Sequence, residues 1–111
     1  MSVASVTVGT VASPPRFVNI VASFSGSSSQ VPNFVDFILR IDLNDQPGGS
    51  EISFDAVNVG DSGDLVRSIF LPAGEHTINL EARANAAGAS IDPVGRPQKD
   101  NASLMVFETA T

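Results

Sequence analysis

The sequence predicts an all-β domain, folded as an antiparallel sandwich or barrel. Val, Ile, Thr, Ser and Phe dominate the chain, in short runs where apolar and polar residues alternate, and such alternation is typical of β-strands. Gly, Pro, Asn and Asp, the residues that form turns, separate these runs. About seven or eight runs follow one another at intervals of roughly ten to fourteen residues, a spacing typical of sandwiches and barrels.

The first half of the chain contains four predicted strands. They are Val3–Val8, Phe17–Phe24, Phe34–Leu43 and Glu51–Val59. The alternation is clearest in the third, whose apolar face is formed by Val35, Phe37, Leu39, Ile41 and Leu43. The predicted breaks after these strands are Pro14-Pro15, the loop Ser25–Pro32, the turn Asn44–Ser50 and the turn Gly60–Gly63.

The second half contains two further full strands, a short piece and a closing strand. Their ranges are Leu65–Leu71, His76–Ala84, Ala89–Asp92 and Ser103–Glu108, with a turn at Pro72–Gly74 and a loop at Asp92–Asn101. The segment Leu80–Ala89 also has high helix propensity. A strand is preferred because the two-residue period is established at Ile78 and because Gly88 would end a helix early.

The chain is predicted to form one domain, since 111 residues suffice for one modest core and not for two. Residues 1–15 are expected to form an N-terminal arm or the first strand, and residues 16–111 the sandwich. No leader pattern and no apolar run near the ~18 residues of a membrane helix is evident. The sequence therefore favours a protein that is made in the cytoplasm and does not enter a membrane.

Composition excludes several classes of partner and chemistry. The net charge is −6, and the six basic residues are scattered from Arg16 to Lys99, so nucleic acid and anionic membranes are not expected partners. The chain has no Cys, which excludes disulfides and thiolate metal sites. It also has no Trp and no Tyr, the rings best suited to stack on a sugar.

Two predicted strands are apolar on both faces. They are "FVNIVASF" and "SLMVF", whereas a strand with one solvated face should alternate. A second copy of the chain is the simplest cover for the outer face. The residues predicted to take part in self-association are Phe17, Val18, Ile20, Phe24, Met105 and Phe107.

The sole histidine, His76, is interpreted as the first residue of a strand. A catalytic histidine needs a carboxylate to orient it. Its neighbour Glu75 would point to the opposite face of the strand. One histidine also supplies only one ligand to a metal, so no catalytic residue and no cofactor is predicted.

The stretch Gly60-Asp61-Ser62-Gly63 resembles the nucleophile loop of trypsin-like serine proteases. Those enzymes need a histidine and an aspartate upstream of the serine, and here the histidine lies downstream. The stretch is also ordinary turn sequence, and a turn is predicted.

Acidic turns offer only weak candidates for a calcium site. Their oxygens have spacings that calcium could use, but none matches the twelve-residue calcium-loop pattern. The candidates are Asp42, Asn44, Asp45, Asp61 and Asp64. No metal is predicted on this basis.

Three segments have a recognisable pattern: "FVDFILRIDL" (Phe34–Leu43), "LPAGEHTINLEARANAAG" (Leu71–Gly88) and "ASLMVFE" (Ala102–Glu108). Together they resemble the small jelly-roll domains of tailed-phage virion proteins, of the capsid decoration and fibre-tip type, which are related in pattern to tumour-necrosis-factor-like trimeric sandwiches. The matching residues are Leu39–Asp42, Pro72–Gly74, His76–Ile78, Leu80, Ala102–Leu104, Val106 and Glu108. The chain departs from the pattern at Leu43, where Gly is common, and in its short tail after Glu108.

The resemblance implies a jelly-roll-like sandwich of about seven or eight strands that is non-enzymatic and trimeric. It implies a virion structural protein, in particular a capsid decoration (cement) protein that binds the phage head surface, with the major capsid protein or another virion protein as partner. The alternative is a receptor- or carbohydrate-binding module of a tail fibre or tail tip. Its candidate surface would be the loops Ser25–Pro32, Asn44–Ser50 and Asp92–Asn101.

Overall fold

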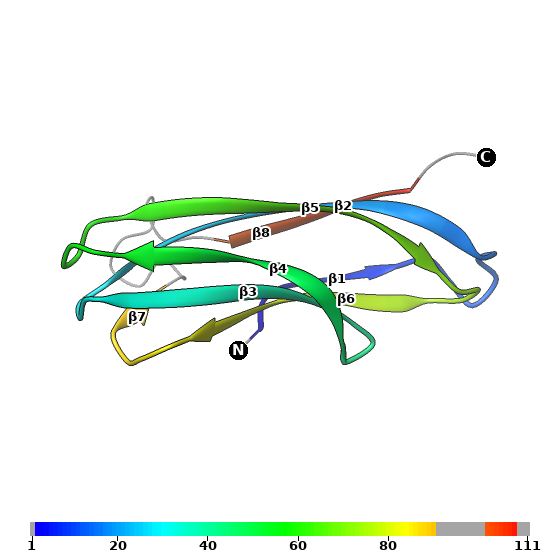
Figure 1. The fold of residues 1–111 in the computed structure, drawn as a ribbon. Coiled ribbons are helices and arrows are strands. Elements are labelled where there is room, and N and C mark those ends of the chain that lie inside the picture. The colour runs from blue at the N-terminus through cyan, green and yellow to red at the C-terminus, as the bar shows by residue number, and fades with distance from the viewer. Residues whose placement is uncertain (1, 91–101, 109–111) are drawn as a thin grey trace.

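The computed structural model, which describes residues 2–90 and 102–108, confirms the predicted antiparallel β-sandwich. Figure 1 shows two layers of strands lying face to face. The strands are β1 (Ser2–Val8), β2 (Arg16–Ser28), β3 (Asn33–Ile41), β4 (Asn44–Phe54), β5 (Asp61–Leu71), β6 (His76–Ala84), β7 (Ala89–Ser90) and β8 (Ala102–Glu108). The described residues contain no helix, so the helical alternative for Leu80–Ala89 does not hold.

Three nested strand pairs organise the two sheets. The first sheet has the order β1-β6-β3-β4. In the second sheet β2 lies between β5 and β8, and its last residues pair with β7. The outer pair β1–β6 and the inner pair β3–β4 lie in the first sheet, while the middle pair β2–β5 lies in the second. This alternation of nested pairs between two sheets is the pairing of a jelly roll.

The core lies between the sheets and is built from alternate residues of each strand. On β2, Val18, Ile20, Ala22 and Phe24 are buried while the residues between them face away. The ring of Phe37 on β3 stacks on Phe24, with centroids 3.7 Å apart and planes 11° apart. The other large, fully buried side chains are Phe54, Leu39, Ile52, Leu71, Ile78, Leu80 and Val35.

The hairpin between β3 and β4 turns earlier than the sequence predicts. Asp42 and Leu43 have φ of 49° and 70°, as a two-residue type I′ turn requires. The predicted strand Phe34–Leu43 therefore ends at Ile41, and Leu43 is 70% exposed instead of facing the core. The predicted turn Asn44–Ser50 is wrong, since it forms the first part of β4.

A bulge explains how the Pro- and Gly-rich start of β4 stays in the sheet. Ile38 pairs with Gly49 and Arg40 with Asp45, so extra residues of β4 face a single residue of β3. A Cβ at Gly49 would lie 2.6 Å from the carbonyl oxygen of Phe37. The glycine is there because another backbone approaches closely, and not because the chain turns.

The predicted turn Gly60–Gly63 is also wrong, because β5 begins at Asp61. Gly63 pairs with Phe24, and a Cβ on it would lie 2.8 Å from the Phe24 ring. The connection lies before it, since β4 ends at Phe54 and Asn58 has a φ of 58°. The predicted strand Glu51–Val59 is therefore too long at its end.

The predictions for the two ends of the chain have different outcomes. Residues Ser2–Val8 form β1, which pairs with β6 at the edge of the first sheet. The predicted short strand near Ala89–Asp92 appears as β7, Ala89–Ser90. The rest of that predicted strand and the whole predicted loop Asp92–Asn101 lie outside the described residues.

Arg16 fastens one end of the sandwich. Its side chain is only 8% exposed and pairs with Glu108 at 3.3 Å. Its guanidinium donates to the carbonyl oxygens of Gly74 at 2.9 Å and Pro72 at 3.3 Å. The start of β2 is thereby tied to the connection between β5 and β6, next to Phe17.

Candidate functional site

The outer face of the second sheet carries a cluster of apolar side chains, called here the apolar patch. It consists of Phe17 and Val21 on β2, Val66 and Phe70 on β5, and Met105 and Phe107 on β8. Strand register brings them together, because Phe17 pairs with Phe70 and Val21 pairs with both Val66 and Met105. The patch therefore spans all three neighbouring strands.

Five of the six members of the patch are large and strongly exposed, while Val21 is half-buried. The exposed fractions are 59% for Phe17, 61% for Val66, 52% for Phe70, 51% for Met105 and 52% for Phe107. The rings of Phe17 and Phe70 meet edge to face, with centroids 5.1 Å apart and planes at 67°. A contiguous exposed apolar surface of this kind is typical of a contact site.

Among the residues that the structure describes, the paired rows of the patch contain no charged residue. The outward positions between the apolar residues are Asn19 and Ser68, which pair with each other. The nearest outward-facing charged residue on the paired rows of β2, β5 and β8 is Asp64, opposite Ser23. Covering the patch would therefore require no desolvation of an ion pair.

The structure divides the residues predicted for self-association. Phe17, Met105 and Phe107 lie in the apolar patch, as their exposure allows. The prediction is wrong for Val18, Ile20 and Phe24, which lie in the core with exposed fractions of 0%, 0% and 2%. Apolar residues on both faces of β2 thus serve two purposes, since one face fills the core and the other remains uncovered by the described residues.

The outer face of the first sheet is different, because it carries ion pairs. Asp45 on β4 forms an ion pair with Arg40 on β3, whose Nε lies 2.9 Å from Asp45 Oδ1, and it accepts from Arg83 on β6 at 3.0 Å. Arg40 also lies 4.0 Å from Glu81 of β6. These four side chains join three neighbouring strands, and the exposed carboxylate of Asp45 lies at the centre of the group.

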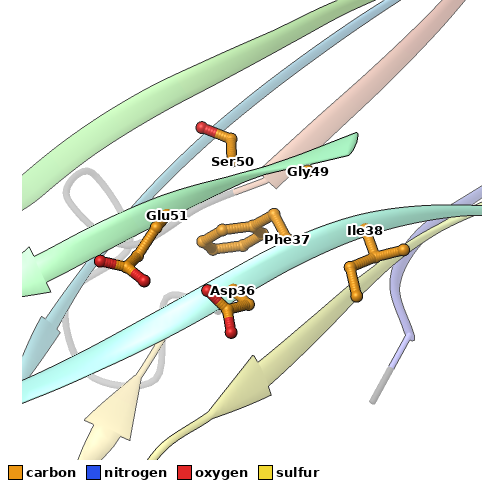
Figure 2. A pocket seen from close by; sticks show the side chains of 6 residues that line it. All are labelled: Asp36, Phe37, Ile38, Gly49, Ser50 and Glu51. Carbon is orange, nitrogen blue, oxygen red and sulfur yellow. The ribbon is translucent and has the colours of Figure 1, made fainter. Parts of the chain in front are cut away.

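A shallow hollow of about 290 Å³ lies on the first sheet beside Gly49. Figure 2 shows the carboxylates of Asp36 and Glu51 on one side of the strands and the Ser50 hydroxyl on the other. Asp36 and Glu51 are paired across β3 and β4. Gly49 is one of the residues that line the hollow, and the lining contains no histidine or cation that could act with these carboxylates.

His76 has an orienting carboxylate after all, which is Asp42 in the β3–β4 turn. His76 Nδ1 lies 2.5 Å from Asp42 Oδ2, and Nε2 lies 2.9 Å from the carbonyl oxygen of Pro72. Asp42 Oδ1 accepts from the backbone N–H of Thr77 at 2.9 Å. The sequence names Asp42 only as a weak calcium candidate, and its contact with His76 does not follow from the sequence because the turn is predicted after Leu43 and not at Asp42 and Leu43.

The contacts of His76 favour its charged form. The hydrogen bond with Asp42 raises the pKa of His76 above its ordinary value of 6.5, and the Pro72 carbonyl adds to this. The same hydrogen bond, with that from Thr77, lowers the pKa of Asp42 below 3.8. Both ring nitrogens face acceptors, so the protonated ring satisfies both. The adjoining hollow of about 230 Å³ is lined by no hydroxyl, thiol or amine side chain.

The calcium candidates are not brought together. Asp42 is held by His76, and Asp45 is held by Arg40 and Arg83. Asp61 accepts from the backbone N–H of Ser62 at 2.8 Å. Among the described residues no group of three or more acidic or histidine side chains is placed to hold a metal ion. Asn44 lies next to the turn, where its amide donates to the Asp42 carbonyl at 3.2 Å.

Comparisons with known proteins give no relative. No family model matches the chain, and neither a curated protein nor a solved structure matches it. Within residues 2–90 and 102–108, no helix is long and apolar enough to cross a membrane.

Proposed function

We propose that the protein is a non-enzymatic structural protein of a virus particle. Within that class, the proposal is a capsid decoration protein that binds the outer surface of a phage head as a trimer, with the major capsid protein as its partner. The protein would be made in the host cytoplasm and end in the virion. The observation that carries the proposal is the uncharged apolar patch on the outer face of the second sheet.

The surroundings of His76 support the non-enzymatic part of the proposal. A general base needs a free nitrogen within reach of a substrate proton. In this chain both nitrogens of His76 are engaged, one by Asp42 and one by the Pro72 carbonyl. The contacts tie two turns together, which is a structural role.

The jelly-roll-like nesting of the strands supports the comparison with phage virion domains. The segments that carry the resemblance contribute β3, β6 and β8, and two of these are neighbours in the first sheet. A receptor- or carbohydrate-binding module of a tail fibre is the alternative. It is less favoured because the chain contains no Trp and no Tyr to stack on a sugar.

The proposal is tested by asking whether virus particles contain this chain. Particles from the source of the gene would be purified on a density gradient, digested with trypsin and examined by mass spectrometry. The peptides Phe17–Arg40 and Ser68–Arg83 are expected at a level comparable with peptides of the major capsid protein. Their absence from intact particles, or their presence in tail fractions only, would contradict a decoration role.

A further inference from the structure

We infer that the apolar patch is the surface through which copies of this chain bind one another. The inference rests on the self-association contained in the proposed function and names the residues that mediate it. It commits to a second copy of the same chain as the occupant of the patch.

The chemistry of the patch limits what can bind it. Five of its side chains are 51–61% exposed, and no charged side chain lies among them. A charged ligand would gain no ion pair there, and a nucleic acid would find no cation to neutralise its phosphates. The occupant must therefore present an apolar surface of its own.

The size of the patch suits the centre of a subunit contact. Three half-exposed Phe side chains with Val66 and Met105 offer roughly 500 Å², within the range of the largest patch on a typical monomer. A stable interface needs about 800 Å² from each partner. Ser23 and Ser103, which pair with each other in the next outward row, would belong to its polar rim, while Asn19 and Ser68 lie within the patch.

Part of the patch is already ordered in the single chain. The Phe17 and Phe70 rings pack edge to face, and Arg16, next to Phe17 in the chain, is fixed by the carbonyl oxygens of Pro72 and Gly74. Little side-chain freedom is then lost on association, which favours binding. A pre-ordered aromatic pair of this kind is typical of an interface anchor.

The same chain is the occupant that fits these requirements, because the patch itself supplies the apolar partner surface. A symmetric assembly can place identical patches against one another or around a common axis. Each chain also carries a net charge of −6, so the copies repel one another at long range, and a contact through an uncharged patch adds no close like-charge pair to this repulsion. Association should therefore strengthen when salt screens the repulsion.

The experiment compares two double variants of the full chain by light scattering behind a sizing column. Phe70→Thr with Phe107→Thr removes two patch rings that are each 52% exposed. Val57→Thr with Val59→Thr is the matched control, because these residues are 52% and 58% exposed but lie in the connection between β4 and β5. Threonine retains strand propensity, and circular dichroism checks that each variant is folded.

The wild type and the control are expected to have a mass of three times 11.5 kDa. The patch variant is expected to have the mass of a single chain. If the wild type is an oligomer and the patch variant remains one, the inference is overturned while self-association stands. If the wild type is a monomer at every concentration and at about 1 M salt, where charges are screened beyond ~3 Å, the inference is overturned together with the trimer. The virion role then depends on the peptide search in particles.

If the patch variant fails to fold, Phe17→Thr alone gives a milder change with the same readout. A weaker association constant for Phe17→Thr supports the inference. An unchanged constant in the folded variant contradicts it.

Discussion

The two outer faces of this sandwich are built from the same kind of strand and present opposite chemistry. The outer face of the first sheet joins Arg40, Asp45, Glu81 and Arg83 through ion pairs. The outer face of the second sheet carries an uncharged apolar patch with a pair of packed Phe rings. Charged side chains can remain in water, whereas a large apolar cluster gains when it is covered. This difference is why we propose that the outer face of the second sheet meets a partner.

The difference does not come from the core, because both sheets fill it in the same way. Phe24 on β2 and Phe37 on β3 face each other and stack across the centre. In each strand alternate residues point into this shared core, so the residues between them face outward and can differ between the two sheets. The outward residues alone decide how the two faces differ.

The largest expected effect on stability distinguishes substitutions on the inner and outer faces of β2. Phe24→Ala removes a ring that is 2% exposed and should lower the free energy of unfolding by about 3–5 kcal/mol at every protein concentration. Phe17→Ala, on the outer side and 59% exposed, should cost less than about 1 kcal/mol in dilute protein. Its effect should grow with concentration as the assembly forms. Chemical denaturation at two concentrations measures both, and equal losses would contradict the division of β2.

The next largest effect on stability is expected at the bulge between β3 and β4 in the first sheet. Gly49→Ala would place a Cβ 2.6 Å from the backbone oxygen of Phe37, and backbone cannot move aside cheaply, so a loss of about 1–3 kcal/mol is expected. Gly60→Ala is the control, since its nearest atom would be 3.8 Å away, and it should be neutral or slightly stabilising. Thermal unfolding distinguishes them. Tolerance of Ala at Gly49 would mean that β3 and β4 do not approach as described.

A smaller effect depends on pH. Because the pKa of His76 is raised on folding, the stability that its charged form contributes is fully present below pH 6.5. That stability is lost as the pH rises through the pKa of His76 in the folded protein. Because the pKa of Asp42 is lowered on folding, the stability that its carboxylate contributes is fully present above pH 3.8. That stability is lost as the pH falls through the pKa of Asp42 in the folded protein. Stability from this pair should therefore be greatest between these two values.

His76→Gln tests that window. Between about pH 6 and about pH 9 the wild type should lose up to about 1 kcal/mol more than the variant, a small amount because Asp42 is 45% exposed. Denaturation midpoints across this range provide the measurement. Parallel pH profiles for the two proteins would show that the pair does not titrate in this way.

The smallest effect probes the ion pairs of the first sheet. Asp45→Asn removes the negative charge that pairs with Arg40 and Arg83 and should cost less than about 1 kcal/mol, because Asp45 is 49% exposed. The loss should shrink in high salt, where surface pairs are screened. Association through the apolar patch should respond to salt in the opposite direction. If the stability lost in Asp45→Asn did not change with salt, the expected contrast between the ion pairs of the first sheet and association through the apolar patch would be contradicted.

Much of the fold could be predicted because alternation is a local property. Val18, Ile20 and Phe24 read as apolar from the sequence alone, but their place inside the core depends on which face of β2 meets the other sheet. The turn at Asp42 and Leu43 could not be predicted, because Leu is an unusual residue at positive φ. The sequence indicates turns at Gly49 and Gly63, whereas in the structure each glycine leaves room for a group from another strand, the Phe37 carbonyl oxygen at Gly49 and the Phe24 ring at Gly63. Those neighbours are distant in the sequence, so the reason for each glycine is not visible there.

The apolar patch was only half predictable for a similar reason. Phe17, Met105 and Phe107 followed from strands that are apolar on both faces. Val66 and Phe70 were missed, although their strand also has adjacent apolar residues on both faces. Only the pairing of β5 and β8 on either side of β2 shows that these side chains form one surface.

The most direct test of which face is covered is the rate at which Met105 is oxidised. Met105 is 51% exposed in the single chain, and dilute peroxide converts an accessible Met to its sulfoxide. Peptide mass spectrometry would follow this conversion in a dilution series of the wild type. Oxidation should be slow in concentrated protein and several-fold faster on dilution, as fast as in the Phe70→Thr/Phe107→Thr variant. Equally fast oxidation at every concentration, in samples whose mass is that of an oligomer, would show that the copies meet elsewhere.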